Sequence, residues 1–212
     1  MSVREPVRVL GPDDDLVAAL GERPRRVLVA GTSGAGKTTL AGRLATVWGI
    51  PHTELDGLFH GPGWQPRPQF LDEVRGLAAS DRWVTEYQYA PARPLLAARA
   101  EVLVWLDLPV RVVMRQVVRR TVRRSVRRTE LWNGNVEPPL WTIVNDRDHI
   151  LRWAWQTRHK LADLPEQLAR DAPHVVVRLR TRRDVDRWVA AQAVAARAIG
   201  ANGGGARPGR AG

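Results

Sequence analysis

The sequence lacks cysteine altogether among its 212 residues. This absence excludes a disulfide framework and any metal site built from thiolates. No apolar run approaches the ~18 residues that a membrane-spanning helix needs, and the first residues lack the basic-then-apolar pattern of a signal peptide. We therefore expect a cytoplasmic protein with no membrane partner.

Lysine is almost absent as well. Of 33 basic residues only two are lysine, Lys37 and Lys160. The net charge is +11, which raises the question of nucleic acid. Residues 111–128, however, hold eight arginines and no acid, so one short stretch supplies most of the net charge. The basic character is thus a local feature and not a coating over the whole surface.

One glycine-rich stretch carries the strongest signal for a ligand. It consists of Gly31, Thr32, Ser33, Gly34, Ala35, Gly36, Lys37 and Thr38, followed by Thr39. An apolar run, 27–30, reads as a buried strand before it, and residues 37–48 read as an amphipathic helix after it. This is the strand–loop–helix context of a G-x-x-x-x-G-K-[ST] phosphate-binding loop.

The residue types in this loop fit the phosphates of ATP. Glycines let backbone N–H groups turn toward phosphate oxygens, and the following helix directs its positive end to the same place. Lys37 adds a compact charge for the β- and γ-phosphates, and the Thr38 hydroxyl is suited to Mg²⁺. A chain that otherwise uses arginine keeps lysine here, where a point charge suits the loop better than a planar fork. We therefore predict ATP and Mg²⁺ as cofactors.

Short apolar runs alternate with helical patterns along the rest of the chain. We predict strands at 26–30, 52–55, 83–85, 102–106 and 174–179, and helices at 37–48, 69–79, 91–98, 109–128, 146–169 and 181–197. Residues 7–10 are either an additional edge strand or part of a flexible leader. Thr181 and Asp184 form a capping box at the start of the last helix.

This alternation, together with the phosphate loop, predicts an α/β protein, namely a three-layer P-loop NTPase fold with a five-stranded, mostly parallel sheet. Residues 1–24 form an N-terminal extension, residues 25–198 form the domain, and residues 199–212 form a disordered tail.

Three carboxylates each follow a predicted strand, where ligands of such sheets bind. Asp56 is suited to orient or deprotonate an acceptor hydroxyl, or to hold Mg²⁺ through water, and capping the next segment is the alternative. Glu86 is the candidate for a carboxylate near Mg²⁺. Asp107 mimics the acid that ends a strand and serves a metal in many NTPases.

Four landmarks together resemble a known family. They are the phosphate loop; Leu55-Asp56 followed by Pro62-Gly63-Trp64; residues 83–89; and Leu106-Asp107-Leu108-Pro109 before the arginine-rich helix. Over residues 25–190 the chain resembles the adenylate-kinase-like small P-loop kinases, and most of all the group labelled DNA topology modulation protein. One stretch departs from that group. The pattern of the group after this strand resembles Asp-Gly-Asn-Tyr, whereas this chain has Glu86-Tyr87-Gln88-Tyr89.

The resemblance implies roles for Asp107 and for the arginine-rich helix. Asp107 would lead into a Leu-x-Pro turn and be mostly structural. The helix would enter a helical, arginine-rich lid at about 120–150. Arg115 and Arg119 would lie near the nucleotide, and Arg123 and Arg127 would belong to the lid and stabilise the transferring phosphoryl group. A solvated basic face is the plain alternative.

The sequence therefore predicts a phosphotransferase that passes the γ-phosphoryl of ATP to a small acceptor, either a nucleotide or a hydroxyl compound, with Lys37, Asp56, Arg123 and Arg127 as its catalytic residues. Two alternatives remain. One is a protein that binds nucleotide and contacts nucleic acid through the arginine-rich helix, which is possible but not favoured. The other is a kinase fold that binds nucleotide without transferring phosphate. The sequence does not indicate an oligomeric state.

Overall fold

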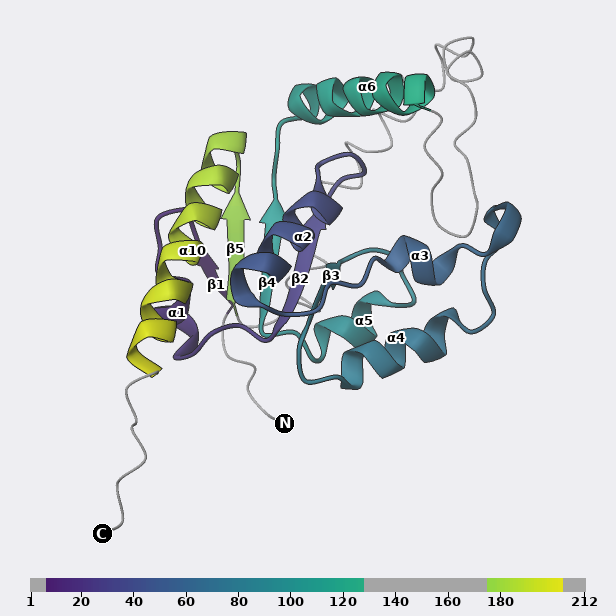
Figure 1. Ribbon diagram of the computed structural model, residues 1–212. Helices are drawn as coiled ribbons and strands as arrows, with labels where there is room; N and C mark the ends of the chain where they lie inside the picture. The colour runs from purple at the N-terminus through teal and green to yellow at the C-terminus, as the bar shows by residue number, and fades with distance from the viewer. Residues whose placement is uncertain (1–6, 128–174, 204–212) are drawn as a thin grey trace.

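A single five-stranded sheet organises the molecule, as the computed structural model shows for residues 7–127 and 175–203 (Figure 1). The strands are β1 (Arg8–Leu10), β2 (Arg26–Gly31), β3 (Trp83–Glu86), β4 (Val102–Leu106) and β5 (Val175–Leu179). Their order is β1-β5-β4-β2-β3, and every neighbouring pair is parallel. All carboxyl ends therefore meet at one edge of the sheet, with the central strand β2 leading into the phosphate loop.

The central strands are apolar on both faces, as a sheet covered on both sides requires. Along β2, Val27 and Val29 belong to one core cluster, whereas Leu28 and Ala30 belong to the other. Helices α1 (Leu16–Leu20), α2 (Lys37–Trp48) and α10 (Arg182–Gly203) cover the first face, and α3 (Leu55–Phe59), α4 (Phe70–Ala79) and α5 (Arg93–Ala97) cover the second. These are the three layers of an α/β P-loop fold, as predicted.

Helix α6 (Val110–Arg127) differs from the covering helices, because it lies across the carboxyl edge of the sheet, above β4 and β2 in Figure 1. No helix in the described ranges is both long enough and apolar enough to cross a membrane. The predicted helix at 146–169, most of the lid and the last nine residues lie outside the described residues.

The strand predicted at 52–55 is wrong. Only His52 forms a bridge, to Val84 of β3, and the chain then enters α3 at Leu55. The cause is a long-range contact, because the Leu55 N–H donates to the Glu86 carboxylate at 3.2 Å instead of joining the ladder. A short 3₁₀ turn, Pro62–Trp64, follows α3.

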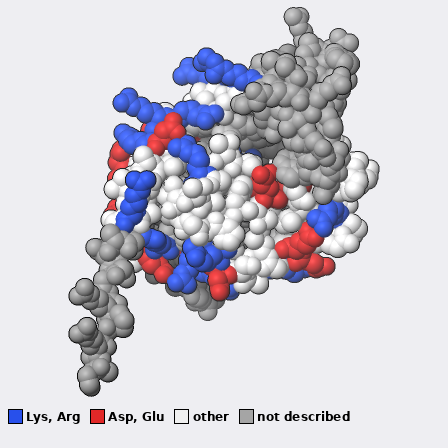
Figure 2. Space-filling model, viewed as in Figure 1, with Lys and Arg blue, Asp and Glu red and all other residues white. Residues whose placement is uncertain are grey.

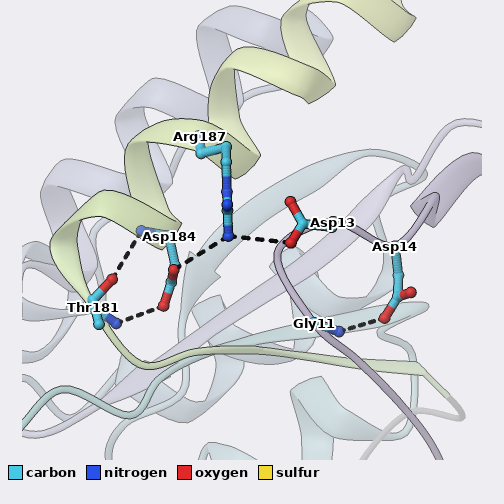
Figure 3. A network of polar contacts seen from close by, with 6 residues as sticks. All are labelled: Gly11, Asp13, Asp14, Thr181, Asp184 and Arg187. Carbon is cyan, nitrogen blue, oxygen red and sulfur yellow. Dashed lines mark hydrogen bonds and ion pairs between the residues drawn. The ribbon is translucent and has the colours of Figure 1, made fainter.

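The fifth strand comes from the N-terminal extension instead. β1 pairs with β5 at the edge of the sheet, which decides for the edge-strand alternative at residues 8–10. Figure 3 shows how this extension is attached to the last helix: Arg187 reaches Asp13 at 3.2 Å and Asp184 at 3.5 Å.

The predicted capping box at the start of α10 is confirmed. The Asp184 N–H donates to Thr181 Oγ1 at 3.0 Å, and the Thr181 N–H donates to Asp184 Oδ2 at 2.9 Å (Figure 3). Helix α10 continues to Gly203, beyond the end predicted at residue 197.

Candidate functional site

The phosphate loop lies between β2 and α2 in a conformation that glycine makes possible. Gly34 and Gly36 have φ angles of 80° and 97°, in the left-handed region that side chains disfavour. Gly36 is the residue from which α2 starts, so the N–H groups of the first turn of α2 face the loop. The Lys37 ammonium donates to the Thr32 carbonyl at 3.3 Å and thus lies over the loop. The result is a cradle of N–H donors with one added positive charge.

Helix α6 packs directly on this loop. A Cβ atom at Gly34 would collide with the Val117 side chain, and one at Gly36 would lie 3.8 Å from Gln116 Oε1. Val113 also lies near Gly34. The side of α6 that faces the loop is therefore formed in this region by Val113, Gln116 and Val117.

The arginines predicted to meet the nucleotide are placed elsewhere on α6. Arg115 and Arg119 are exposed, as is Arg111. Arg115 follows Val113 by two residues, and Arg119 follows Val117 by two, which is a rotation of about 200° around the helix. In this arrangement they point away from the loop-facing side, and their nucleotide contacts stay a prediction. The Arg123 and Arg127 side chains lie outside what the structure describes.

Glu86 ends β3 and is the most deeply buried of the strand-end carboxylates, with 1% of its surface exposed. Burial raises the pKa of the Glu86 carboxyl, but the His52 imidazole, the Leu55 N–H and the Thr38 hydroxyl together hold that pKa below its ordinary value. His52 Nε2 lies 3.5 Å from Glu86 Oε1. The carboxylate is therefore ionised at neutral pH and lies against the first turn of α2.

Thr38 and Glu86 fit the Mg²⁺ that a nucleotide brings. Within the described residues, Glu86 Oε1 is buried and makes no hydrogen bond of ordinary geometry. Such an atom has lost its water without gaining a full partner, which a cation would supply. In phosphate sites Mg²⁺ is held by one or two protein oxygens together with the phosphates, and these two side chains would provide them.

Asp56 lies in the first turn of α3 and is surrounded by the segment after β3. Asp56 Oδ1 accepts a hydrogen bond from Tyr89 Oη at 2.6 Å and another from Gln88 Nε2 at 2.9 Å. Tyr89 Oη also lies 3.3 Å from His60 Nε2. Burial and the neighbouring Asp56 raise the pKa of the Tyr89 phenol, so the phenol remains protonated and donates.

Asp107, by contrast, is neutralised by arginine. Arg178 Nε of β5 donates to Asp107 Oδ2 at 2.9 Å, Arg178 Nη2 forms an ion pair with the same oxygen at 2.7 Å, and Arg180 Nε lies at 3.8 Å. The Arg178 guanidinium also lies 4.5 Å from the centre of the Trp105 ring. The structural role expected for Asp107 thus has a physical basis.

Several residues around the site were not indicated by the sequence. The sequence patterns indicated no role for His52, His60, Gln88 or Tyr89. The only available signal was position, since residues 86–89 and Asp56 both follow predicted strands whose ends meet at one edge. Tyr87, the bulky residue of the departing stretch, is 3% exposed and packs against Arg93, whose guanidinium lies 5.2 Å from its ring centre.

The surface above the site is basic. Figure 2 shows blue side chains along the top of the molecule, where α6 lies. The exposed arginines of α6 that the structure describes are Arg111, Arg115 and Arg119. Anions approaching the carboxyl edge from this direction meet a favourable potential.

Comparisons with known proteins found only distant likenesses to solved structures. No family model and no curated protein matches the chain. Among solved structures it is similar to a sugar kinase from Janibacter sp. HTCC2649, with 20% identity, TM-score 0.45, and 80% of this chain and 92% of that chain covered. It is also similar to a shikimate kinase from Acinetobacter baumannii in complex with shikimate (19%, 0.48, 84% and 94%) and to a gluconokinase from Sinorhizobium meliloti 1021 (18%, 0.48, 84% and 97%). At these identities and TM-scores the likeness carries no argument about the site or its substrate.

Proposed function

We propose that this protein is an ATP-dependent phosphotransferase that passes the γ-phosphoryl group to a small acceptor bearing a hydroxyl or phosphate group. The observation that carries the proposal is the position of Glu86. Its carboxylate lies against Thr38 of the phosphate loop and also accepts the N–H of Leu55, the residue before Asp56. One buried carboxylate thus contacts both the phosphate loop and the segment that carries Asp56, at the same edge of the sheet.

The residues divide the work of an in-line transfer. The loop N–H groups and Lys37 bind the phosphates and offset charge as it develops on the γ-phosphoryl oxygens. Mg²⁺, held by Thr38 and Glu86 together with the nucleotide, would supply further charge compensation. Asp56 orients the acceptor hydroxyl toward the phosphorus and accepts its proton. Arg115, Arg119, Arg123 and Arg127 join the site in this proposal if α6 and the segment after it close over the nucleotide.

The sequence landmarks support a finer version of the same proposal. They resemble the adenylate-kinase-like group labelled DNA topology modulation protein, so a nucleotide acceptor is one arm of the test. Small hydroxy acids and sugars form the other arm. A cytoplasmic location also belongs to this proposal, because ATP and Mg²⁺ are abundant there.

The test is a transfer screen with ATP and Mg²⁺ against nucleoside monophosphates, nucleosides, sugars and hydroxy acids including shikimate and gluconate. Lys37→Met should lower turnover at least ~100-fold, since it removes a charge that acts in the transition state. Lys160→Met is the matched control, being the same change at the only other lysine. Wild-type turnover in Lys37→Met, or no transfer to any acceptor by the wild-type protein, would overturn the proposal.

A second candidate function rests on the exposed arginines of α6. There the helix would contact nucleic-acid phosphates, with ATP binding as a switch. Such binding should weaken steeply with salt, because each phosphate contact releases counterions. Affinity for duplex DNA that is unchanged between 50 and 200 mM salt would exclude this function.

A further inference from the structure

The hydrogen bonds to Asp56 are unevenly shared between its two oxygens. Tyr89 Oη and Gln88 Nε2 both donate to Oδ1, at 2.6 and 2.9 Å. The hydrogen bonds of the described residues leave Oδ2 for another partner. A carboxylate fixed through one oxygen cannot rotate freely about its χ2 angle, so the other oxygen keeps a defined direction. This is the arrangement that a group orienting a substrate hydroxyl needs.

The backbone of Tyr89 is held in a costly conformation. Its φ is 59°, and within the described residues the only other non-glycine residue with a positive φ is Trp64, at 61°. Conformations of this kind are strained and gather at functional sites. Both residues contact His60: Trp64 meets it edge-on with ring centres 5.2 Å apart, and the Tyr89 ring centre is 6.4 Å away.

Aromatic packing explains the ring of Tyr89 but not its hydroxyl. The ring is stacked on Phe59 at 4.2 Å between centres and meets Phe70 edge-on at 5.3 Å. Phenylalanine would fill the same space equally well. The hydroxyl is directed instead to Asp56, through the shorter of the two bonds that Oδ1 accepts.

The direction of these bonds assigns the tautomer of His60. An ionised carboxylate only accepts, so Tyr89 Oη must give its single proton to Asp56. The contact of 3.3 Å between Tyr89 Oη and His60 Nε2 is then a hydrogen bond only if His60 Nε2 carries a proton and donates it. The chain of donors runs from His60 to Tyr89 to Asp56.

We propose that Tyr89, supported by His60 and Gln88, is a positioning residue that fixes Asp56 with Oδ1 occupied and Oδ2 directed to the acceptor hydroxyl. The inference rests on the proposed function for the role of Asp56. It gives a role to residues 86–89, the stretch in which this chain departs from the family pattern. Gln88 and Tyr89 hold the acid, whereas Tyr87 is buried away from it under Arg93.

The test is a double-mutant cycle between Tyr89→Phe and Asp56→Asn, measured with the acceptor found in the transfer screen. Tyr89→Phe should lower kcat about 10-fold with the KM for ATP unchanged, because it loosens the acceptor side and leaves the phosphate side intact. In the Asp56→Asn background the same change should alter kcat less than about 2-fold, since the carboxylate that Tyr89 fixes is no longer present. Tyr87→Phe is the matched control and should behave as wild type.

A second measurement needs no turnover. The nitrogen shifts of His60 in an NMR spectrum, assigned with His60→Gln, should show the Nε2–H tautomer in the wild-type protein and a shifted tautomer ratio in Tyr89→Phe. An equal loss of kcat in both backgrounds, or the Nδ1–H tautomer, would overturn the inference. A wild-type protein that shows the Nε2–H tautomer but transfers phosphate to no acceptor would instead overturn the proposed function, and with it the catalytic part of this inference.

Discussion

Glu86 and Asp107 occupy matching places on either side of the phosphate loop. β3 and β4 are the two neighbours of β2, and each of these strands ends in or just before an acid. Their surroundings are opposite. Asp107 Oδ2 lies within 2.9 Å of two nitrogens of Arg178, whereas Glu86 Oε1 has the imidazole of His52 at 3.5 Å. A strand-end carboxylate thus becomes a metal candidate only when its charge is left without a permanent cation.

The position of each strand in the sheet produces this difference. β4 is an inner strand, and its neighbour β5 brings Arg178 into register with Trp105, two residues before Asp107. β3 is the edge strand of the described sheet, and the segment that carries His52 meets it through an isolated bridge. The comparison therefore supports the proposed Mg²⁺ role of Glu86 and a structural ion pair for Asp107.

The largest expected effect comes from removing the Glu86 charge. Glu86→Gln should lower kcat/KM about 100-fold and raise the Mg²⁺ concentration needed for half-maximal rate, because the buried oxygen near Thr38 no longer attracts a cation. Steady-state assays over a range of Mg²⁺ measure both quantities. Asp107→Asn is the control and should stay within about 3-fold of wild type. Equal losses in the two variants would remove the distinction.

A smaller effect is expected on stability. Asp107→Asn should lower the free energy of unfolding by about 1 kcal/mol, which is ordinary for a partly exposed ion pair. Urea unfolding followed by tryptophan fluorescence gives this value. Unchanged stability would mean that the pair with Arg178 contributes nothing to the fold.

The coupling between Asp107 and Arg178 should be smaller still. In a cycle of Asp107→Asn, Arg178→Met and the double variant, we expect an interaction energy of about 0.5–1 kcal/mol, since one charge-assisted hydrogen bond joins the two groups. The control cycle pairs Asp107→Asn with Arg82→Met, whose guanidinium bonds the carbonyls of Trp48 and Gly49. If both cycles gave the same coupling, the ion pair would not be specific.

The smallest effect is a difference in pH dependence. The pKa of Glu86 is lowered in the folded state, so its charge stabilises the fold above the ordinary value of 4.5 and this contribution is lost as the pH falls below it. Wild-type protein should therefore lose stability between about pH 5 and pH 3 more steeply than Glu86→Gln. Urea midpoints at several pH values measure the difference. Parallel curves would show that the carboxylate is not favoured by its surroundings.

Local features of the sequence predicted most of the fold. The phosphate loop, the helix after it and the alternation of apolar strands with helices all depend on residues close in the chain, and the capping box at Thr181 does too. The strand at 52–55 failed because Leu55 gives its N–H to an acid 31 residues away. No pattern within a short window contains that contact.

The candidate residues could be picked from the sequence, but their contacts could not. Lys37, Thr38 and Glu86 follow from a motif and from a strand end, whereas Asp56 was picked through a strand at 52–55 that the structure does not have. The contacts of Asp56 with Tyr89 and of Asp107 with Arg178 depend on which strands are neighbours, and that order becomes known only from the folded sheet. The orientation of α6 likewise follows from Val113 and Val117 meeting the loop, a contact that the arginine spacing does not reveal.

The pairing of β1 with β5 has a consequence for synthesis. Arg8 lies beside Val175, so β1 is synthesised long before β5, the strand with which it pairs. Closing so long a loop is slow, and until then β1 has no strand partner while β5 lacks one of its two neighbours. The nascent chain can assemble β2, β3 and β4 around the phosphate loop much earlier. Under the proposed function, ATP would therefore bind and stabilise a growing chain before its outer strands are in place.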